Sequence, residues 1–337
     1  MPYAGYWDTR QGGRSENQDS CGFLDTEKGL IAVVCDGMGG GPAGQLASTI
    51  AVQKIVEYVI GAPIDMPRTE MVANAIEYAH QSILAKAAEN TALRGMGSTA
   101  TVVLLNNQSA VIGHVGDSRV YQFRHGKSIF RTADHSIVGE LVRNGSLTEE
   151  QARLSPRSNI ITRALGSKLT DLADVTERPY EKGDRFMLCT DGIWGALPEP
   201  ELIKKMAKTP SLSGAVDGIV VDVDERGRAD GNKHDNLTVA LLETKQDSLL
   251  KEKMSKKTLR ILIILAVLCL LSIILNFVLL TRDADKIHDS EMDALITQNE
   301  ERGQRIRALE DSINRLYEDI ATSKHEAADA NLKAAKE

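Results

Sequence analysis

Five aspartates share one setting, the end of an apolar run or a tight turn beside glycine: Asp19, Asp36, Asp117, Asp191 and Asp235. Asp36, for example, follows a strand-like run and precedes four glycines and one methionine in D-G-M-G-G-G, and Asp191 ends the run F-M-L-C-T. Carboxylate and carbonyl oxygens are the ligands of Mg²⁺ and Mn²⁺, whereas zinc prefers histidine or thiolate. One such aspartate is more often a turn or capping residue, so it is the set that indicates an oxygen-ligated metal site.

The elements that must position these aspartates alternate along residues 1–245. Short apolar runs predict strands, and longer runs with apolar residues at helical spacing predict helices. The predicted strands are Leu30–Cys35, Ser98–Leu105, Ala110–Val115, Arg119–Arg124, Arg185–Thr190 and Leu237–Glu243. The predicted helices are Gly44–Ile60, Arg68–Asn90, Ser136–Asn144 and Thr148–Ala152. Strands in runs, set apart from paired helices, predict an α+β fold with antiparallel sheets.

Bulk composition excludes some classes of function. The 337 residues carry a net charge of −7, which argues against a nucleic-acid binder, since such proteins normally present a basic face. None of the four cysteines is paired at zinc spacing, and we expect them to be reduced, small hydrophobic residues. Residues 1–13 hold no apolar stretch, so the sequence predicts no secretory signal peptide.

Eight short motifs follow one another in order along residues 1–245: R-S-E-N-Q-D-S, V-V-C-D-G-M-G-G, G-M-G-S-T-A-T, V-G-D-S-R-V-Y, D-H-S-I-V, I-T-R-A-L-G, L-C-T-D-G-I-W and D-N-L-T-V. In order and spacing they resemble the metal-dependent protein phosphatases (PPM, type 2C), in the bacterial branch of that family. The resemblance implies a β-sandwich of two antiparallel sheets flanked by paired α-helices. It also implies a centre of two Mg²⁺ or Mn²⁺ ions at one end of the sandwich.

The resemblance assigns roles to individual residues. Asp36 would bridge the two metal ions, and Gly37 would offer its carbonyl oxygen. Asp191 and Asp235 would ligate one of the ions. Arg14 would hold the substrate phosphate through its fork of donors.

Four further residues receive roles in the same way. Asp19 would hold metal-bound waters from the second coordination shell. Asp117, together with Asp191, matches the pair that forms a third, weaker metal site in bacterial members. Ser98 and Thr99 fall in the motif that lines the cleft.

The implied chemistry is direct hydrolysis, in which a bridging water of lowered pKa attacks phosphorus. The sequence holds neither the C-x₅-R loop of cysteine phosphatases nor the G-x-S-x-G motif of serine hydrolases, in agreement with that mechanism. Many relatives carry histidine where this chain has Met38 or Gly41, and an acidic residue where it has Gln18. The general acid is therefore unassigned: metal-bound water is our default, and His135 and His234 are alternatives that are more often structural.

A second region, residues 259–280, is almost wholly apolar, and its core from Ile261 to Leu280 contains no charged residue. Twenty residues at about 1.5 Å each span about 30 Å, the thickness of the hydrocarbon core, so we expect a transmembrane helix rather than a buried core helix. The linker 246–258 is basic, and the far flank carries little positive charge. The positive-inside rule therefore predicts a single-pass protein of the cytoplasmic membrane, with the phosphatase domain in the cytoplasm.

The tail, residues 281–337, is predicted to lie outside and carries a heptad stripe of Ile306, Leu309, Ile313, Leu316 and Ile320. Isoleucine at a, leucine at d and Asn299 at an a position favour a parallel two-stranded coiled coil, and hence a homodimer. An isolated amphipathic or disordered segment is the alternative.

Together these features predict a membrane-anchored phosphatase of phosphoserine and phosphothreonine proteins, acting against a membrane serine/threonine kinase. The segment from Ser136 to Gly166 would form a flap beside the site that selects substrates. The alternative from another class is a catalytically silent module that binds phosphoproteins. Retention of Asp36, Asp117, Asp191, Asp235 and Arg14 favours the enzyme.

Overall fold

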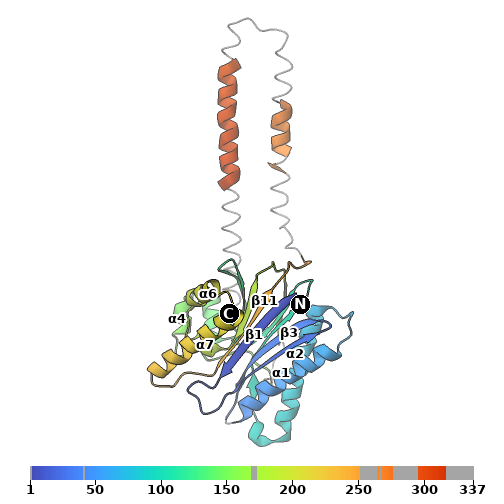
Figure 1. Cartoon of the computed structure of the whole chain (residues 1–337), viewed down its shortest axis with the longest axis vertical. Coiled ribbons are helices and arrows are strands. Elements are labelled where there is room, and N and C mark those ends of the chain that lie inside the picture. Colours follow the sequence, from blue (N-terminus) through green and yellow to red (C-terminus); the bar gives the residue numbers. More distant parts are fainter. Residues whose placement is uncertain are drawn as a thin grey trace. The chain divides into compact units, whose positions relative to one another are not determined.

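The structure, a computed structural model, describes residues 2–40, 42–167, 173–250, 264–265, 267–275 and 295–315. Residues up to 250 form a four-layer unit of helices and sheets (Figure 1). Helical residues 267–275 and 295–315 belong to a second compact unit and are described by themselves.

Two antiparallel sheets form the centre of the first unit. In one sheet the strand order is β1 (Tyr3–Arg10), β11 (Leu237–Thr244), β10 (Arg185–Cys189), β7 (Arg119–Arg124) and β8 (Lys127–Arg131). In the other it is β2 (Asp19–Thr26), β3 (Gly29–Met38), β5 (Ala100–Leu105), β6 (Ala110–Val115) and β9 (Asp174–Arg178). The short strand β4 (Gly97–Ser98) pairs with the end of β3.

Helices cover the outer face of each sheet. Helices α1 (Ala43–Gly61) and α2 (Arg68–Glu89) pack on the β3 sheet, and α6 (Glu199–Lys208) and α7 (Leu212–Ala229) pack on the β11 sheet (Figure 1). Because successive side chains of a strand point to opposite faces, β3 serves two cores. Ile31 and Val33 pack under α1 and α2, whereas Ala32 and Val34 pack between the sheets.

The predicted flap holds two short helices, α3 (Ile137–Arg143) and α4 (Glu149–Arg153). The hydroxyl of Ser136 caps α3, and Thr148 with Gln151 forms a complete capping box on α4. Among the described residues of this unit, the remaining helices are the 3-10 turn η1 (Thr91–Leu93) and α5 (Asp191–Trp194).

The structure confirms the α+β prediction of antiparallel sheets with helices, and it adds detail. A hairpin at residues 124–127 joins β7 to β8, with positive φ at His125 and Gly126. The predicted strand Ser98–Leu105 is divided, because Thr99 separates β4 from β5.

Some elements of the fold were not predicted from the sequence. Strands β1, β2 and β9 and helices α6 and α7 had no matching prediction. β1 and β9 are mostly half-buried or exposed, so their hydrophobic alternation is faint.

The predicted membrane span and tail lie only partly within the described residues. Residues 264–265, 267–275 and 295–315 are helical. Among the helices that the structure describes, none is long and apolar enough to cross a bilayer. Residues 251–263, 276–294 and 316–337, which carry most of the linker, the rest of the span and the heptad positions Leu316 and Ile320, lie outside the described part of the chain.

Candidate metal centre

The predicted aspartates gather at one end of the sandwich. In the antiparallel sheets this end receives the start of β2, the ends of β3, β6 and β10 and the start of β11. A cleft of about 440 Å³ opens there, and its lining includes Asp36, Asp117, Asp191 and Asp235 together with Gly37. Asp36 and Asp235, which are 199 positions apart in sequence, therefore share one cleft, because their strands end on the same side of the antiparallel sheets.

Asp36 is held by its own backbone. Its N–H donates to the Thr99 hydroxyl at 2.8 Å, and its carbonyl oxygen accepts from the Thr99 N–H at 2.8 Å and from the Ser98 hydroxyl at 3.1 Å. The break between β4 and β5 at Thr99 is therefore the point that fixes the end of β3. These bonds leave the Asp36 carboxylate available to the cleft.

Asp19 lies behind the cleft rather than in its lining. It is the cross-strand partner of Asp36 and is buried. One carboxylate oxygen accepts from the Thr190 hydroxyl at 2.9 Å, and Thr190 directly precedes Asp191. Asp19 thus links the Asp36 strand to the loop that carries Asp191.

The Asp117 turn is fixed on both sides. The Trp194 indole N–H donates to the Asp117 carbonyl at 2.9 Å, and the hydroxyls of Ser118 and Thr99 share a hydrogen bond of 2.7 Å. Trp194 ends α5, which Asp191 begins, so one short helix positions two cleft carboxylates. Asp117 and Asp191 are the pair predicted for the weaker third ion.

Arg14 reaches the cleft from the β1–β2 loop and ion-pairs with Asp235 at 2.7 Å. About half of its side chain is exposed, at 53%. The loop is tied down by Asn236, whose side-chain amide donates to the carbonyl oxygens of Gln11 and Glu16. Arg14 is therefore placed at the mouth of the cleft, where an incoming anion would meet it.

The carboxylates raise one another's pKa. Burial raises the pKa of Asp19 to about 7 and that of Asp191 to about 6, and neighbouring carboxylates add to both shifts. The pKa of Asp36 and of Asp117 is raised well above the ordinary value, first by burial and then by carboxylates such as Asp191. So much negative charge in one cleft is stable only with bound protons or bound cations.

The donor set fits Mg²⁺ or Mn²⁺. All of its candidate ligand atoms are oxygens, and the backbone at Gly37 approaches closely: a Cβ there would lie 2.0 Å from the Gly44 carbonyl oxygen. Glycine is therefore required at this position, and Gly37 lines the cleft. Asp36, Gly37, Asp191, Asp235 and Asp117 are the residues that would hold the ions.

The two histidines considered as general acids stand elsewhere. His135 is buried, with its Nε2 at 3.1 Å from Asp174, and His234 places its Nε2 at 2.9 Å from Asp224. Neither lines the cleft, where Met38 and Gln18 do. Gly41 lies outside the described residues.

Six lining residues received no individual role from the sequence: Ser15, Glu16, Gly39, Asn159, Ile161 and Asn236. Five of them stand within the motifs that carry the resemblance, and Asn159 does not. Asn159 and Ile161 come from the predicted flap, and for Asn159 the flap as a whole was the only signal.

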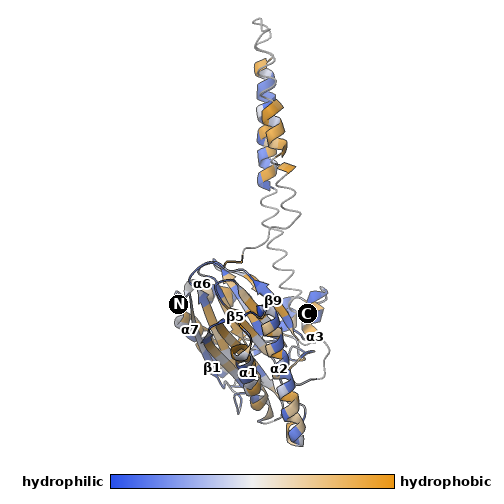
Figure 2. Cartoon of the chain, turned by 90° about the vertical axis from the view of Figure 1, so that its right-hand side faces the viewer, coloured by the Kyte–Doolittle hydropathy of each residue, from blue (hydrophilic) through white to orange (hydrophobic). Residues whose placement is uncertain are grey.

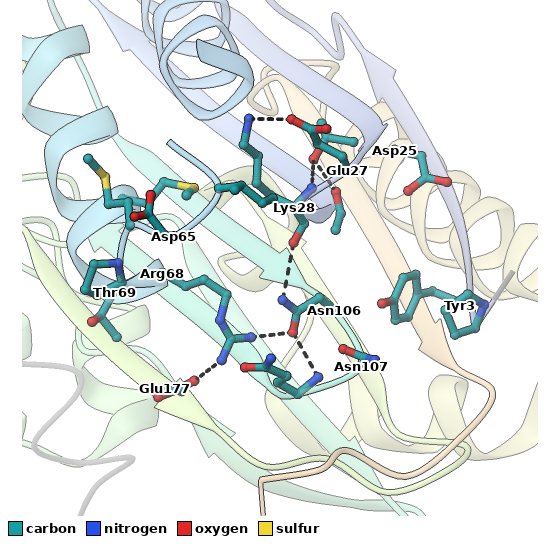
Figure 3. A pocket seen from close by; sticks show the side chains of 18 residues that line it. Tyr3, Asp25, Glu27, Lys28, Asp65, Arg68, Thr69, Asn106, Asn107 and Glu177 are labelled. Atoms are coloured by element: carbon teal, nitrogen blue, oxygen red, sulfur yellow. Dashed lines mark hydrogen bonds and ion pairs between the residues drawn. The ribbon is translucent and has the colours of Figure 1, made fainter. Parts of the chain in front are cut away.

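A larger pocket, of about 750 Å³, lies at the opposite end of the sandwich, around the β2–β3 and β5–β6 turns (Figure 3). Lys28 pairs there with Glu27, and Arg68 contacts Asn106 and Glu177. The chain also leaves the domain at this end, since the Leu249 N–H donates to the Asn107 carbonyl at 2.9 Å. None of the residues predicted for the metal centre lines this pocket.

Comparisons with known proteins agree with this geometry. Residues 9–218 match the family model described as protein phosphatase 2C. The serine/threonine phosphatase stp of Listeria innocua is 32% identical over 234 residues, which cover 68% of this chain and 91% of the relative.

Solved structures are also similar. Serine/threonine phosphatase Stp1 from Staphylococcus aureus has a TM-score of 0.65 at 26% identity, covering 72% of this chain and 94% of that one. The catalytic domain of the serine/threonine protein phosphatase PstP, in complex with two manganese ions, has a TM-score of 0.60 at 26% identity, covering 72% and 99%.

Proposed function

The chain belongs to the protein phosphatase 2C family and is a serine/threonine phosphatase, and we propose that it hydrolyses phosphoproteins directly with water at the aspartate cleft. The observation that carries this proposal is the convergence of Asp36, Asp117, Asp191 and Asp235 on one cleft that also receives Arg14. The phosphatase 2C family is metal-dependent. Two Mg²⁺ or Mn²⁺ ions, when bound, would supply an activated water and neutralise charge on the phosphate.

The residues of this chain divide the remaining work. Asp36, Gly37, Asp191 and Asp235 hold the cations, and Asp19 orients the Asp36 and Asp191 segments from behind. Arg14 has free donors beyond its bond to Asp235 and can bind phosphate oxygens in a bidentate manner. When cations take the place of the protons that the carboxylates share, they also remove the mutual repulsion of the carboxylates.

The test is hydrolysis of p-nitrophenyl phosphate and of a phosphothreonine peptide by the full chain with Mn²⁺. Asp36→Asn should lower kcat at least about 1,000-fold, because a bridging ligand is lost. Asp25→Asn, an exposed aspartate at the opposite end, is the matched control and should leave turnover unchanged. A wild-type chain without metal-dependent turnover would instead support the silent phosphoprotein-binding module.

We also propose that residues 259–280 anchor the domain in the cytoplasmic membrane, with the tail outside. In support, the described part of this stretch is helical and apolar (Figure 2), and Leu270, Leu271 and Ile273 are 61%, 55% and 66% exposed. Apolar side chains so exposed require a lipid or protein environment. We expect the full chain to sediment with membranes after a carbonate wash. We also expect a protease added outside the cell to cleave the tail.

For the tail we propose a parallel homodimer. In support, residues 295–315 form one helix, and its heptad residues Ile306 and Leu309 are 40% and 55% exposed. Monomeric sedimentation of the detergent-solubilised full chain would reject the dimer. As substrates we propose phosphoserine and phosphothreonine proteins, including those of a membrane serine/threonine kinase, and a phosphoproteome that does not change upon deletion would reject them.

A further inference from the structure

Three side chains outside the cleft form a cluster of metal-ligand type. His114 is the penultimate residue of β6, and Asp174, which begins β9, is its direct cross-strand partner. His135 follows β8 and packs its ring against that of His114, with ring centroids 4.6 Å apart. One ligand atom from each of the three lies within 4.8 Å of the others.

His114 has the free capacity that a ligand needs. It shares a strand face with Ala110 and Ile112, which pack between the sheets, and its ring is buried. Neither ring nitrogen makes a hydrogen bond within normal geometric limits. Leaving such groups unsatisfied costs about 1–3 kcal/mol, so a buried, unpartnered imidazole aimed at a carboxylate calls for an explanation.

His114 and Asp174 are both in the protonation state that binds cations. Burial holds the pKa of His114 well below its usual value, so the ring is neutral and keeps a free lone pair. The Asp174 carboxylate and the Ser118 backbone oppose this shift. The pKa of Asp174 is lowered, first by its hydrogen bond with His135, so this carboxylate is ionised.

The spacing is close to that of metal coordination. His135 Nε2 and Asp174 Oδ2 are 3.1 Å apart. Two ligand atoms at about 2.1 Å from one ion stand about 3.4 Å apart in a tetrahedral site. An ion could therefore replace the proton between these atoms with little movement.

A guanidinium group also faces these atoms and would compete with an ion for them. Arg163 Nη1 lies 3.1 Å from Asp174 Oδ1 and 3.4 Å from His135 Nε2. The Arg163 side chain is 33% exposed, and it contacts the carboxylate oxygen that the ion would not use. Asp174, with 53% exposure, offers the route from solvent.

We propose that His114, His135 and Asp174 form a second metal site, of two imidazoles and one carboxylate, that takes zinc or a similar borderline ion. Imidazole ligands select such ions over Mg²⁺, and three protein ligands leave a fourth position for water. This donor set differs from the all-oxygen cleft, so the two sites would select different metals.

The site is coupled to the cleft through Gly116. The His135 ring Nδ1 accepts a hydrogen bond from the Gly116 backbone N–H at 3.1 Å, and the His135 backbone N–H donates to the Gly116 carbonyl at 2.7 Å. Neutral His135 therefore carries its proton on Nε2. An ion at Nε2 displaces that proton, and its transfer to Nδ1 breaks the bond to the Gly116 N–H and shifts the peptide that precedes Asp117. Zinc at this site thus disfavours the arrangement of Asp117 that the cleft uses.

The experiment measures zinc binding by isothermal titration calorimetry. It uses the detergent-solubilised full chain in excess Mg²⁺, so that the oxygen site is occupied and no substrate is needed. One zinc ion per chain should bind, and His114→Asn and Asp174→Asn should each weaken it at least about 100-fold. His125→Asn, which changes an exposed hairpin histidine, is the matched control and should bind as the wild type does.

A second readout follows turnover. One equivalent of zinc should reduce Mn²⁺-supported hydrolysis by the wild type and leave the Asp174→Asn chain unaffected. If His114→Asn lowers the melting temperature sharply, the test rests on Asp174→Asn alone. The Asp174 side chain is half exposed, so its substitution should not disturb folding. Zinc binding unchanged in Asp174→Asn overturns the proposal. If the chain binds zinc in this way but hydrolyses no phosphate ester, the proposed phosphatase function is wrong and the zinc site is still supported.

Discussion

Removing the metal ions should make the stability of the domain fall as pH rises. Burial raises the pKa of Asp19 from 3.8 to about 7 in the metal-free fold. A carboxyl whose folded-state pKa exceeds its unfolded value is protonated more readily in the folded state. Its stabilising contribution is fully present below the unfolded pKa and is lost as pH rises through the folded one.

The magnitude follows from the pH window. Between pH 5 and pH 8 the unfolded chain has already released this proton, whereas the folded chain releases it near pH 7. The free energy of unfolding should therefore fall by about 1.4 kcal/mol per pH unit over about two units, or about 3 kcal/mol. For a domain of this size that is a drop in melting temperature of roughly 5–10 °C. Asp191, with its pKa raised to about 6, acts in the same direction.

The assay is thermal unfolding of the wild type and Asp19→Asn in EDTA at pH 5 and pH 8, repeated with Mn²⁺. The asparagine keeps an acceptor for the Thr190 hydroxyl but has no proton to lose. The variant should match the wild type at pH 5 and exceed its melting temperature at pH 8, and Mn²⁺ should remove the advantage. A difference between the two proteins that is independent of pH, or larger at pH 5, would refute the reasoning.

Three further outcomes are expected. Arg14→Ala should raise KM for a phosphopeptide about tenfold or more, with a smaller effect on kcat, because Arg14 binds phosphate at the mouth of the cleft. Steady-state kinetics measure KM and kcat separately, and an effect on kcat alone would contradict the assignment. Thr99→Val should cost about 1–3 kcal/mol in urea unfolding, since the Asp36 N–H loses its buried acceptor, and an unchanged midpoint would contradict this. Gly37→Ala should abolish Mn²⁺ binding or folding, because the new Cβ would lie 2.0 Å from the Gly44 carbonyl oxygen. If calorimetry shows wild-type Mn²⁺ affinity in the variant, the backbone can move to make room, and this expectation is wrong.

The aspartates could be predicted because their signal is local. Each stands where an apolar run meets a glycine or a turn, and strand ends are the part of a sheet that pattern reasoning locates well. Asp36, Asp117, Asp191 and Asp235 do share one cleft, whereas Asp19 lies behind it. Their roles as metal ligands stay a prediction that the metal-binding experiments address.

What sequence could not supply depends on contacts between distant segments. The cross-strand pairing of His114 with Asp174 spans sixty residues, and only the register of β6 and β9 brings these two together. Asn159 and Ile161 line the cleft through the path of the flap, which no periodicity encodes. The sequence suggested His135 as an acid for the leaving group, but its ring faces Gly116 and Asp174 instead.

The exit of the chain beside Asn107 has a consequence for reach. A strand such as β3, of ten residues, is about 33 Å long, so the cleft stands about that far from the point where the chain leaves the domain. The cleft and the exit therefore lie at opposite ends of the same unit. A segment joined to the domain after residue 250 is attached away from the cleft, so the point of attachment does not itself obstruct substrates.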